Sequence, residues 1–156
     1  LYEDFQCPAC GRWGQNVFPT VVRNELANGF VKIAFHSLAF IGPESTAAGR
    51  AAWAAAEQGR FWDMWATLYA NQGLHENDGS FKRDRLIAMA DAIGLDSARF
   101  AADLDSTAAA TWVADGVTAA ASAGVDSTPT LLIDGTAVIG SGYPDVAAAI
   151  AAAGAR

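Results

Sequence analysis

Cysteine and histidine are both scarce in this sequence, with two of each among 156 residues. The cysteines are Cys7 and Cys10, and the histidines, His36 and His75, stand far from them and from each other. A structural zinc site needs about four Cys or His ligands at short spacings. These residues therefore argue against a metal centre, and neither a metal nor an organic cofactor is expected.

Positive charge and long apolar runs are also lacking. Ten lysines and arginines stand against 17 aspartates and glutamates, which gives a net charge of −7 and no basic run. Nucleic acid is therefore not an expected partner, because binding to phosphates requires clustered basic side chains. The longest apolar run, residues 146–153, is far shorter than the roughly 20 residues that cross a membrane. No signal peptide is visible, and any membrane anchor is expected upstream of Leu1.

Apolar residues are plentiful, and their spacing predicts an α/β domain. Hydrophobic side chains make up 52% of the chain, enough for a buried core. The first predicted elements are a strand at residues 1–5, a helix from Cys10 to about Asn28 and a strand over 30–35. Five helices follow within 43–123. Two strands over 131–133 and 136–139, joined by a type I′ turn, and a helix over 143–153 complete the chain. The strands can share one sheet, with a right-handed first connection. The aromatic cluster of Phe61, Trp62 and Trp65 is expected to be core packing.

The two cysteines form a Cys-Pro-Ala-Cys motif. Cysteines separated by two residues are typical of redox dithiols, zinc sites and small disulfide loops. A disulfide between Cys7 and Cys10 closes so small a loop that it would constrain the unfolded chain little. The spacing therefore favours a redox dithiol, and a structural disulfide remains the alternative.

The segments on either side of the motif favour a reactive Cys7. The motif follows the first predicted strand, and Pro8 suits the first turn of the next helix, where a missing N–H costs nothing. Cys7 would then stand at the helix N-terminus, where free N–H groups stabilise a thiolate. This position lowers the pKa of a cysteine and makes it a nucleophile. Cys10 lies one turn further in, where burial would keep its thiol protonated.

Two stretches of the sequence resemble a known family. Residues 2–11 read YEDFQCPACG, residues 127–130 read STPT before the hairpin, and the helical block lies between them. This combination resembles the DsbA family of thioredoxin-fold disulfide oxidoreductases, and the Ala-rich composition is similar to that of its membrane-tethered actinobacterial members. The resemblance covers essentially the whole chain. It implies one DsbA-like domain over residues 1–156, with thioredoxin-like parts at 1–42 and 124–156 and a helical insertion at 43–123.

The resemblance also implies a function and its residues. Cys7 and Cys10 would be catalytic, and Thr128 and Pro129 would bind substrate backbone, with Pro129 in a cis bond beside the dithiol. The protein would be an extracytoplasmic oxidase that introduces disulfides into reduced or unfolded secreted proteins. A quinone-linked membrane protein would reoxidise the pair. The alternatives are a reductase or isomerase, and a non-catalytic peptide-binding module with a structural disulfide.

The sequence departs from the family pattern at one acidic position. The family often has a buried acid six residues before the first cysteine, where this chain has Leu1. Glu3 lies on the same face of the strand and can take over this proton transfer. Transfer through water, and a Glu3 that is simply solvated at the strand end, are the alternatives. The motif also lacks a histidine between its cysteines, so the pKa of Cys7 is expected between about 3.5 and about 7, the values for DsbA and thioredoxin.

Overall fold

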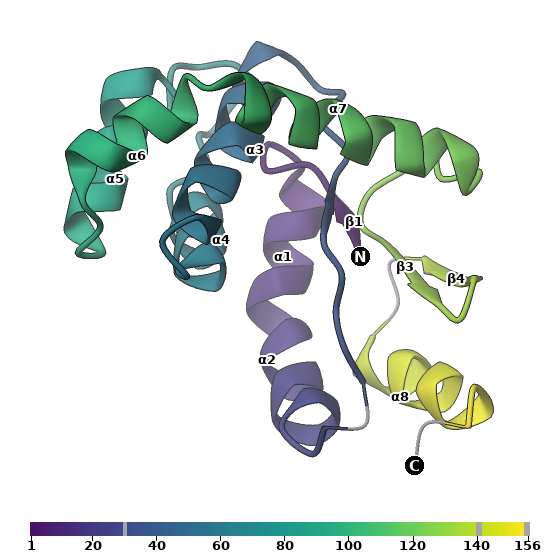
Figure 1. Ribbon diagram of the computed structural model, residues 1–156. Helices are drawn as coiled ribbons and strands as arrows, with labels where there is room; N and C mark the ends of the chain where they lie inside the picture. The colour runs from purple at the N-terminus through teal and green to yellow at the C-terminus, as the bar shows by residue number, and fades with distance from the viewer. Residues whose placement is uncertain (30, 140–141, 155–156) are drawn as a thin grey trace.

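A computed structural model describes residues 1–29, 31–139 and 142–154, which form a small mixed sheet and the helices around it (Figure 1). In chain order, the elements are β1 (Tyr2–Glu3), α1 (Pro8–Asn16), α2 (Phe18–Val21), the π-helical turn η1 (Val22–Leu26), β2 (His36–Ser37), α3 (Pro43–Ala56), α4 (Phe61–Ala70), α5 (Arg83–Ala92), α6 (Ser97–Leu104), α7 (Thr107–Ser122), β3 (Thr130–Ile133), β4 (Thr136–Ile139) and α8 (Tyr143–Ala152). The predicted order of strand, helix, strand, helical block, hairpin and helix is confirmed.

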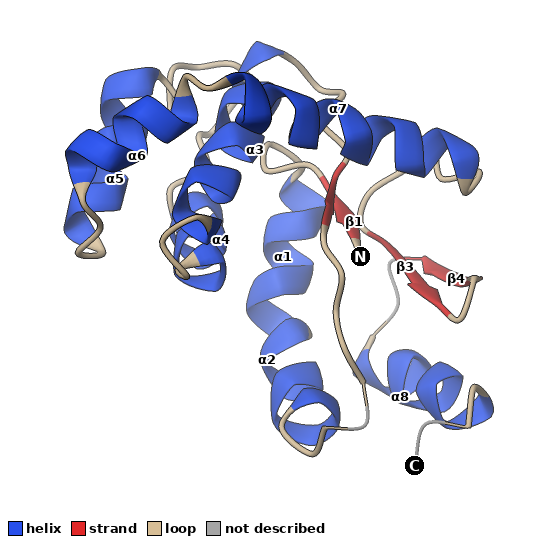
Figure 2. Ribbon diagram, viewed as in Figure 1, coloured by secondary structure: helices blue, strands red, loops and turns tan. Residues whose placement is uncertain are grey.

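The sheet has the strand order β2-β1-β3-β4 (Figure 2). β1 and β2 are parallel, whereas β3 pairs antiparallel with both β1 and β4. In the turn between β3 and β4, Asp134 and Gly135 have φ angles of 46° and 83°. A type I′ turn requires positive φ at both central residues, so the predicted hairpin is confirmed.

The strand predicted over residues 30–35 is wrong in its position. β2 begins after this segment, and Phe30 lies outside the described residues. The pairing with β1 begins where the Leu1 ammonium donates to the Ala34 carbonyl oxygen at 2.8 Å. Alternating apolar residues mark the two faces of an extended segment, but the bounds of a strand depend on where its partner lies.

The helix predicted from Cys10 to Asn28 is divided. α1 ends at Asn16, α2 follows it, and η1 completes the segment. Pro19 lies in the first turn of α2. A proline is tolerated there, but it has no N–H with which to continue the hydrogen bonds of the preceding helix.

Helices α3 to α6 gather at one end of the molecule, and the sheet and α8 lie at the other (Figure 1). α7 runs between these ends and packs closely on β2: a Cβ on Gly116 would lie 2.5 Å from the Ser37 carbonyl oxygen. One hydrophobic core joins both ends and includes Phe5, Trp65 and Val146. Within the described parts of the chain, no helix is both long and apolar enough to cross a membrane.

Candidate active site

The Cys-Pro-Ala-Cys motif lies where the chain passes from β1 to α1. Cys7 is the N-cap of α1, and its Sγ accepts a hydrogen bond from the Cys10 backbone N–H at 3.4 Å. Pro8 occupies the first helical turn. The Cys7 N–H donates to the Asp4 carbonyl oxygen at 3.0 Å and closes the turn before the helix. The Cys7 sulfur therefore lies beside the free N–H groups of a helix N-terminus, which stabilise negative charge.

The two thiols have different surroundings. Both are free, and Cys7 is 8% exposed whereas Cys10 is fully buried. The pKa of Cys7 is lowered to about 6, mainly by a hydrogen bond from the Cys10 thiol and further by Thr128 and by backbone N–H groups. Burial raises the pKa of Cys10. Cys7 is thus the thiolate of the pair at neutral pH, and its pKa lies within the range expected from the motif. With 8% of its surface exposed, Cys7 is less accessible than a nucleophile on the protein surface.

The loop that precedes β3 lies against Cys7. The Thr128–Pro129 bond is cis, and the Cys7 Sγ lies 3.5 Å from the Thr128 carbonyl oxygen, to which it can donate when it is protonated. Pro129 is buried and Thr128 is half-buried. The Thr130 hydroxyl donates to the Ser127 carbonyl oxygen at 2.7 Å and holds the loop in shape. The fold thus brings the two residues expected to bind substrate beside the dithiol, although about 120 residues separate them from it in the chain.

Glu3 is fully buried, so the alternative of a solvated side chain at the strand end is wrong. The Trp65 Nε1–H donates to Glu3 Oε2 at 2.8 Å, and the Tyr69 hydroxyl donates to the same oxygen at 3.1 Å. Burial outweighs these hydrogen bonds and raises the pKa of Glu3 to about 8. The carboxyl group therefore carries a proton at neutral pH. When ionised, it raises the pKa of Cys10, so the two groups lie within electrostatic reach of each other.

Asp4, which the sequence does not single out, anchors the turn before the motif. Its side chain is fully buried. Oδ1 accepts a hydrogen bond from the Gln6 N–H at 2.8 Å, and Oδ2 accepts from the N–H groups of Phe40 and Ile41 at 3.0 and 3.1 Å. One carboxylate thus ties the turn before Cys7 to the loop that follows β2.

The loop between α4 and α5 reaches the motif from the helical insertion. The Gln72 side-chain amide donates to the carbonyl oxygens of Phe5 at 2.8 Å and Cys7 at 3.0 Å. A Cβ on Gly11 would collide with the Gln72 side chain, so the glycine allows this close approach. In the same loop, the Asn77 N–H donates to the Gln6 side-chain oxygen at 2.6 Å. Nothing in the local sequence marks Gln72, because its partners are backbone atoms 65 and 67 residues away.

Trp65 is buried, as the aromatic pattern predicts, but Trp62 is 40% exposed, so the prediction of core packing is wrong for Trp62. Trp65 and Tyr69 also carry the polar contacts of Glu3. The two residues are four apart and lie on one face of α4. One signal could have pointed to this contact. A buried indole N–H or phenol O–H needs a partner, and a carboxylate on an apolar strand needs donors.

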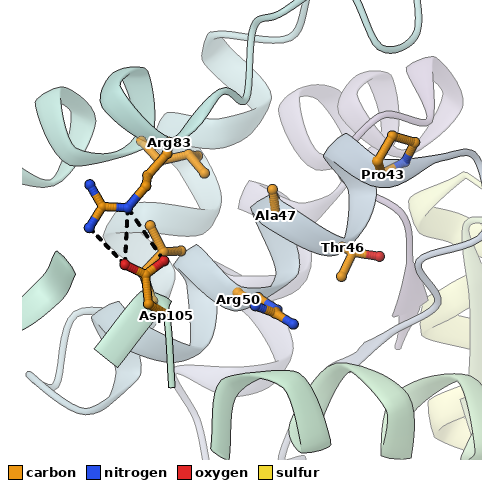
Figure 3. Close-up of a pocket in the computed structure, with 8 residues that line it drawn as sticks. Pro43, Thr46, Ala47, Arg50, Arg83 and Asp105 are labelled. Atoms are coloured by element: carbon orange, nitrogen blue, oxygen red, sulfur yellow. Dashed lines mark hydrogen bonds and ion pairs between the residues drawn. The ribbon is translucent and has the colours of Figure 1, made fainter. Parts of the chain in front are cut away.

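Two hollows lie away from the dithiol. One, of about 200 Å³, lies in the helical insertion and is lined by Pro43, Thr46, Ala47, Arg50, Arg83 and Asp105, among others (Figure 3). The other, of about 680 Å³, is lined by residues of α1, α2, β3 and α8, such as Trp13, Leu131 and Ile150. No cysteine is among the described residues that line either hollow. Nor do three or more Cys, His, Asp or Glu side chains gather as a metal site in the described chain.

Residues 1–152 match the model of a protein family described as Thioredoxin. The chain belongs to this thioredoxin family. Its structure is similar to oxidised BdbD from Bacillus subtilis, with a TM-score of 0.88 and 20% identity over 97% of this chain and 84% of that chain. It is also similar to the reduced disulfide bond oxidoreductase DsbG from Mycobacterium tuberculosis, with a TM-score of 0.79 and 25% identity over 99% of this chain and 76% of that chain.

Reduced DsbA from Mycobacterium tuberculosis is a further similar structure, with a TM-score of 0.69 and 23% identity over 97% of this chain and 86% of that chain. The predicted thioredoxin-like α/β fold with inserted helices is confirmed. The predicted kinship with DsbA is confirmed as well, and so is the enzyme class of thiol–disulfide oxidoreductase.

Curated relatives include two proteins named as Na(+)/H(+) antiporters. NhaA 1 of Salinispora arenicola is 33% identical over 138 residues, which are 86% of this chain and 19% of that protein. NhaA of Herminiimonas arsenicoxydans is 32% identical over 144 residues, which are 90% of this chain and 21% of that protein. The chain therefore spans about one fifth of the length of these relatives.

Proposed function

We propose that this chain acts outside the cytoplasm as an oxidase that introduces disulfides into reduced secreted proteins through Cys7 and Cys10. The observation that carries this proposal is the asymmetry of the pair. The pKa of Cys7 is lowered to about 6, and burial raises that of Cys10. A stabilised Cys7 thiolate favours the reduced form of the pair, and a pair that is stable when reduced is a good oxidant of other thiols.

In the proposed reaction, a substrate thiolate attacks the Cys7 sulfur of the Cys7–Cys10 disulfide. A mixed disulfide forms between substrate and Cys7, and Cys10 leaves as a thiolate that takes up a proton. A second substrate thiolate then attacks the substrate sulfur of the mixed disulfide and releases the Cys7 thiolate. Two electrons pass from the substrate dithiol to the protein, and the substrate leaves with a disulfide.

Glu3 is the proposed source of the proton for Cys10. With a pKa of about 8, it is mostly protonated at neutral pH and can donate to a departing thiolate. Its carboxylate can take the proton back when Cys10 must attack during reoxidation. A buried acid suits this role because solvent has no access to Cys10, which has no exposed surface.

Reduced, unfolded proteins are the proposed substrates, with Thr128 and Pro129 next to their backbone. Two exposed apolar side chains belong to loops that Asp4 and Gln72 hold to the segment around the motif, and they support this choice. Phe40 is 55% exposed and follows β2 in the loop that Asp4 holds, and Leu74 is 95% exposed in the loop that Gln72 ties to Cys7. Unfolded chains offer apolar side chains that such residues can contact.

The proposed compartment follows from the chemistry. An oxidising dithiol in the cytosol would be held reduced by glutathione and thioredoxin, so an oxidase needs a location outside it. A membrane protein is the proposed partner that reoxidises the pair. The antiporter names give no reason to propose ion exchange for this chain, because it matches about one fifth of the length of those proteins.

Equilibration of the purified protein with glutathione buffers tests the direction of electron flow. We expect a potential between roughly −270 and −120 mV, the values for thioredoxin and DsbA. A potential at or below that of thioredoxin would instead support a reductase.

Trapping experiments separate an enzyme from a non-catalytic module with a structural disulfide. Cys10→Ala that already carries glutathione in a disulfide with Cys7 should exchange the glutathione for a reduced protein and accumulate that mixed disulfide, whereas Cys7→Ala treated with oxidised glutathione in the same way should accumulate few. Equal trapping by both variants, or none by either, would contradict the roles proposed for the two cysteines.

A further inference from the structure

The polar contacts of the Glu3 carboxyl group come from one helix of the insertion. Trp65 and Tyr69, both on α4, donate to the same oxygen, Oε2, at 2.8 and 3.1 Å. The other oxygen, Oε1, is buried and has no hydrogen-bond partner among the described residues. The carboxyl group is therefore held from one side only.

A second contact joins Tyr69 to the turn that carries the nucleophile. The Tyr69 hydroxyl lies 3.4 Å from the Asp4 carbonyl oxygen, which also accepts the Cys7 N–H at 3.0 Å. Cys10, Trp65 and Tyr69 belong to the same buried core cluster. The two donors of α4 therefore belong to the same core as Cys10, and Glu3 is hydrogen-bonded to both donors.

We propose that Trp65 and Tyr69 are positioning residues that occupy Oε2 of Glu3 and thereby make Oε1 the atom that exchanges a proton with Cys10. This inference rests on the proton transfer proposed above for Glu3, and it assigns to the helical insertion a part in the chemistry of the dithiol. A proton on Oε2 would displace one of two hydrogen bonds in a buried site, whereas a proton on Oε1 displaces none. In the exchange, the S–H bond of Cys10 breaks as the O–H bond of Oε1 forms, or the reverse.

The same two donors set the pH at which the exchange works. They stabilise the carboxylate more than the acid and so oppose the rise in the pKa of Glu3 that burial causes. The other charged side chain that acts on Glu3 is the Cys7 thiolate, which raises its pKa. Removal of either donor should therefore shift the titration of Glu3 upward.

The test follows the step in which Cys10 attacks a mixed disulfide. Oxidised glutathione converts the reduced protein at low pH to a mixed disulfide between Cys7 and glutathione. The release of glutathione is then followed after a jump to each of several pH values. The variants are Tyr69→Phe, Trp65→Phe and Glu3→Gln. Trp62→Phe is the matched control, because Trp62 lies on the same helix and packs on Trp65 with ring centroids 5.7 Å apart, without a bond to Glu3.

In the unaltered protein and in Trp62→Phe, the release rate should rise with a midpoint near pH 8, the pKa of Glu3. Glu3→Gln should lack this inflection. Tyr69→Phe and Trp65→Phe should keep it but move it up by about one pH unit, which slows release about ten-fold at pH 7. Infrared titration of the protonated carboxyl band, assigned by its loss in Glu3→Gln, should show the same shift without reliance on the reaction.

The outcomes separate the two levels of the proposal. A profile in Glu3→Gln that keeps the inflection would overturn the proton-transfer role of Glu3 itself. An inflection that is lost in Glu3→Gln but stays at the original pH in Tyr69→Phe would overturn the positioning role alone. Thermal melting checks that each variant is folded, and if Trp65→Phe is not, Tyr69→Phe decides the question because it keeps the ring and removes only the hydroxyl.

Discussion

Glu3 and Asp4 are neighbours at the end of β1, and both side chains are fully buried, but their partners differ. The Asp4 side chain accepts hydrogen bonds from three backbone N–H groups, one at Oδ1 and two at Oδ2. Glu3 accepts two side-chain donors, both on Oε2, and its Oε1 is without a partner among the described residues. The Asp4 carboxylate faces the loops around the motif, and the Glu3 carboxyl group faces helix α4.

This difference shows how one short segment can combine an anchor with a titratable group. Asp4 accepts backbone N–H groups from the two segments that it holds together, so it serves the fold. Glu3 has one oxygen without a hydrogen-bond partner in the described part of the chain, and its pKa is raised to about 8, close to neutral pH. Burial with complete hydrogen bonding stabilises a structure, and burial with incomplete hydrogen bonding prepares a group for proton transfer.

Removal of the anchor should have the largest effect. Asp4→Ala leaves three backbone N–H groups without their acceptor, so the free energy of unfolding should fall by about 4 kcal/mol. Urea unfolding at pH 7 measures the change. Asp78→Ala is the control, since the exposed Asp78 accepts backbone N–H groups only within its own turn, and its loss should change stability little. If Asp4→Ala and Asp78→Ala lost the same unfolding free energy, the burial of Asp4 would not make it a stronger anchor than the exposed Asp78.

Removal of the titratable group should have an effect that depends on pH. A carboxyl group with a raised pKa binds more protons in the folded state, so stability is present at low pH and is lost as pH rises toward about 8. Relative to Glu3→Gln, the unaltered protein should lose about 2 kcal/mol of unfolding free energy between pH 6 and pH 8. Urea unfolding of both proteins across this range gives the difference, and a constant difference would show that Glu3 does not titrate there.

Removal of the contact from the insertion should have the smallest effect. Gln72→Ala removes two hydrogen bonds to carbonyl oxygens of the motif, at a cost of about 1 kcal/mol in unfolding free energy. The pH midpoint of Cys7 alkylation should stay near 6, because Gln72 contacts the Cys7 carbonyl oxygen and not its sulfur. Gln15→Ala, on the exposed face of α1, is the matched control. A large shift in the alkylation midpoint would mean that the insertion also sets the reactivity of Cys7.

Much of the site could be predicted from local sequence. A Cys-Pro-Ala-Cys motif after a short apolar strand predicts a helix N-terminus at Cys7, since proline suits the first turn and apolar residues recur at helical spacing beyond it. The Asp134–Gly135 pair predicts the hairpin turn in the same way. Pro19 also favours an end of the first helix, but the apolar pattern continues past it and by itself predicts one longer helix.

Local sequence is enough to place the dithiol at the start of its helix, to locate the hairpin turn and to show which helices can bury an apolar face. The groups that surround the dithiol depend on the tertiary structure. The donors to Glu3 are 62 and 66 residues away, and the Thr128 carbonyl oxygen is 121 residues from Cys7. The physical reason is that periodicity shows which side of an element is buried, whereas the partner of a buried polar group depends on how distant elements pack together.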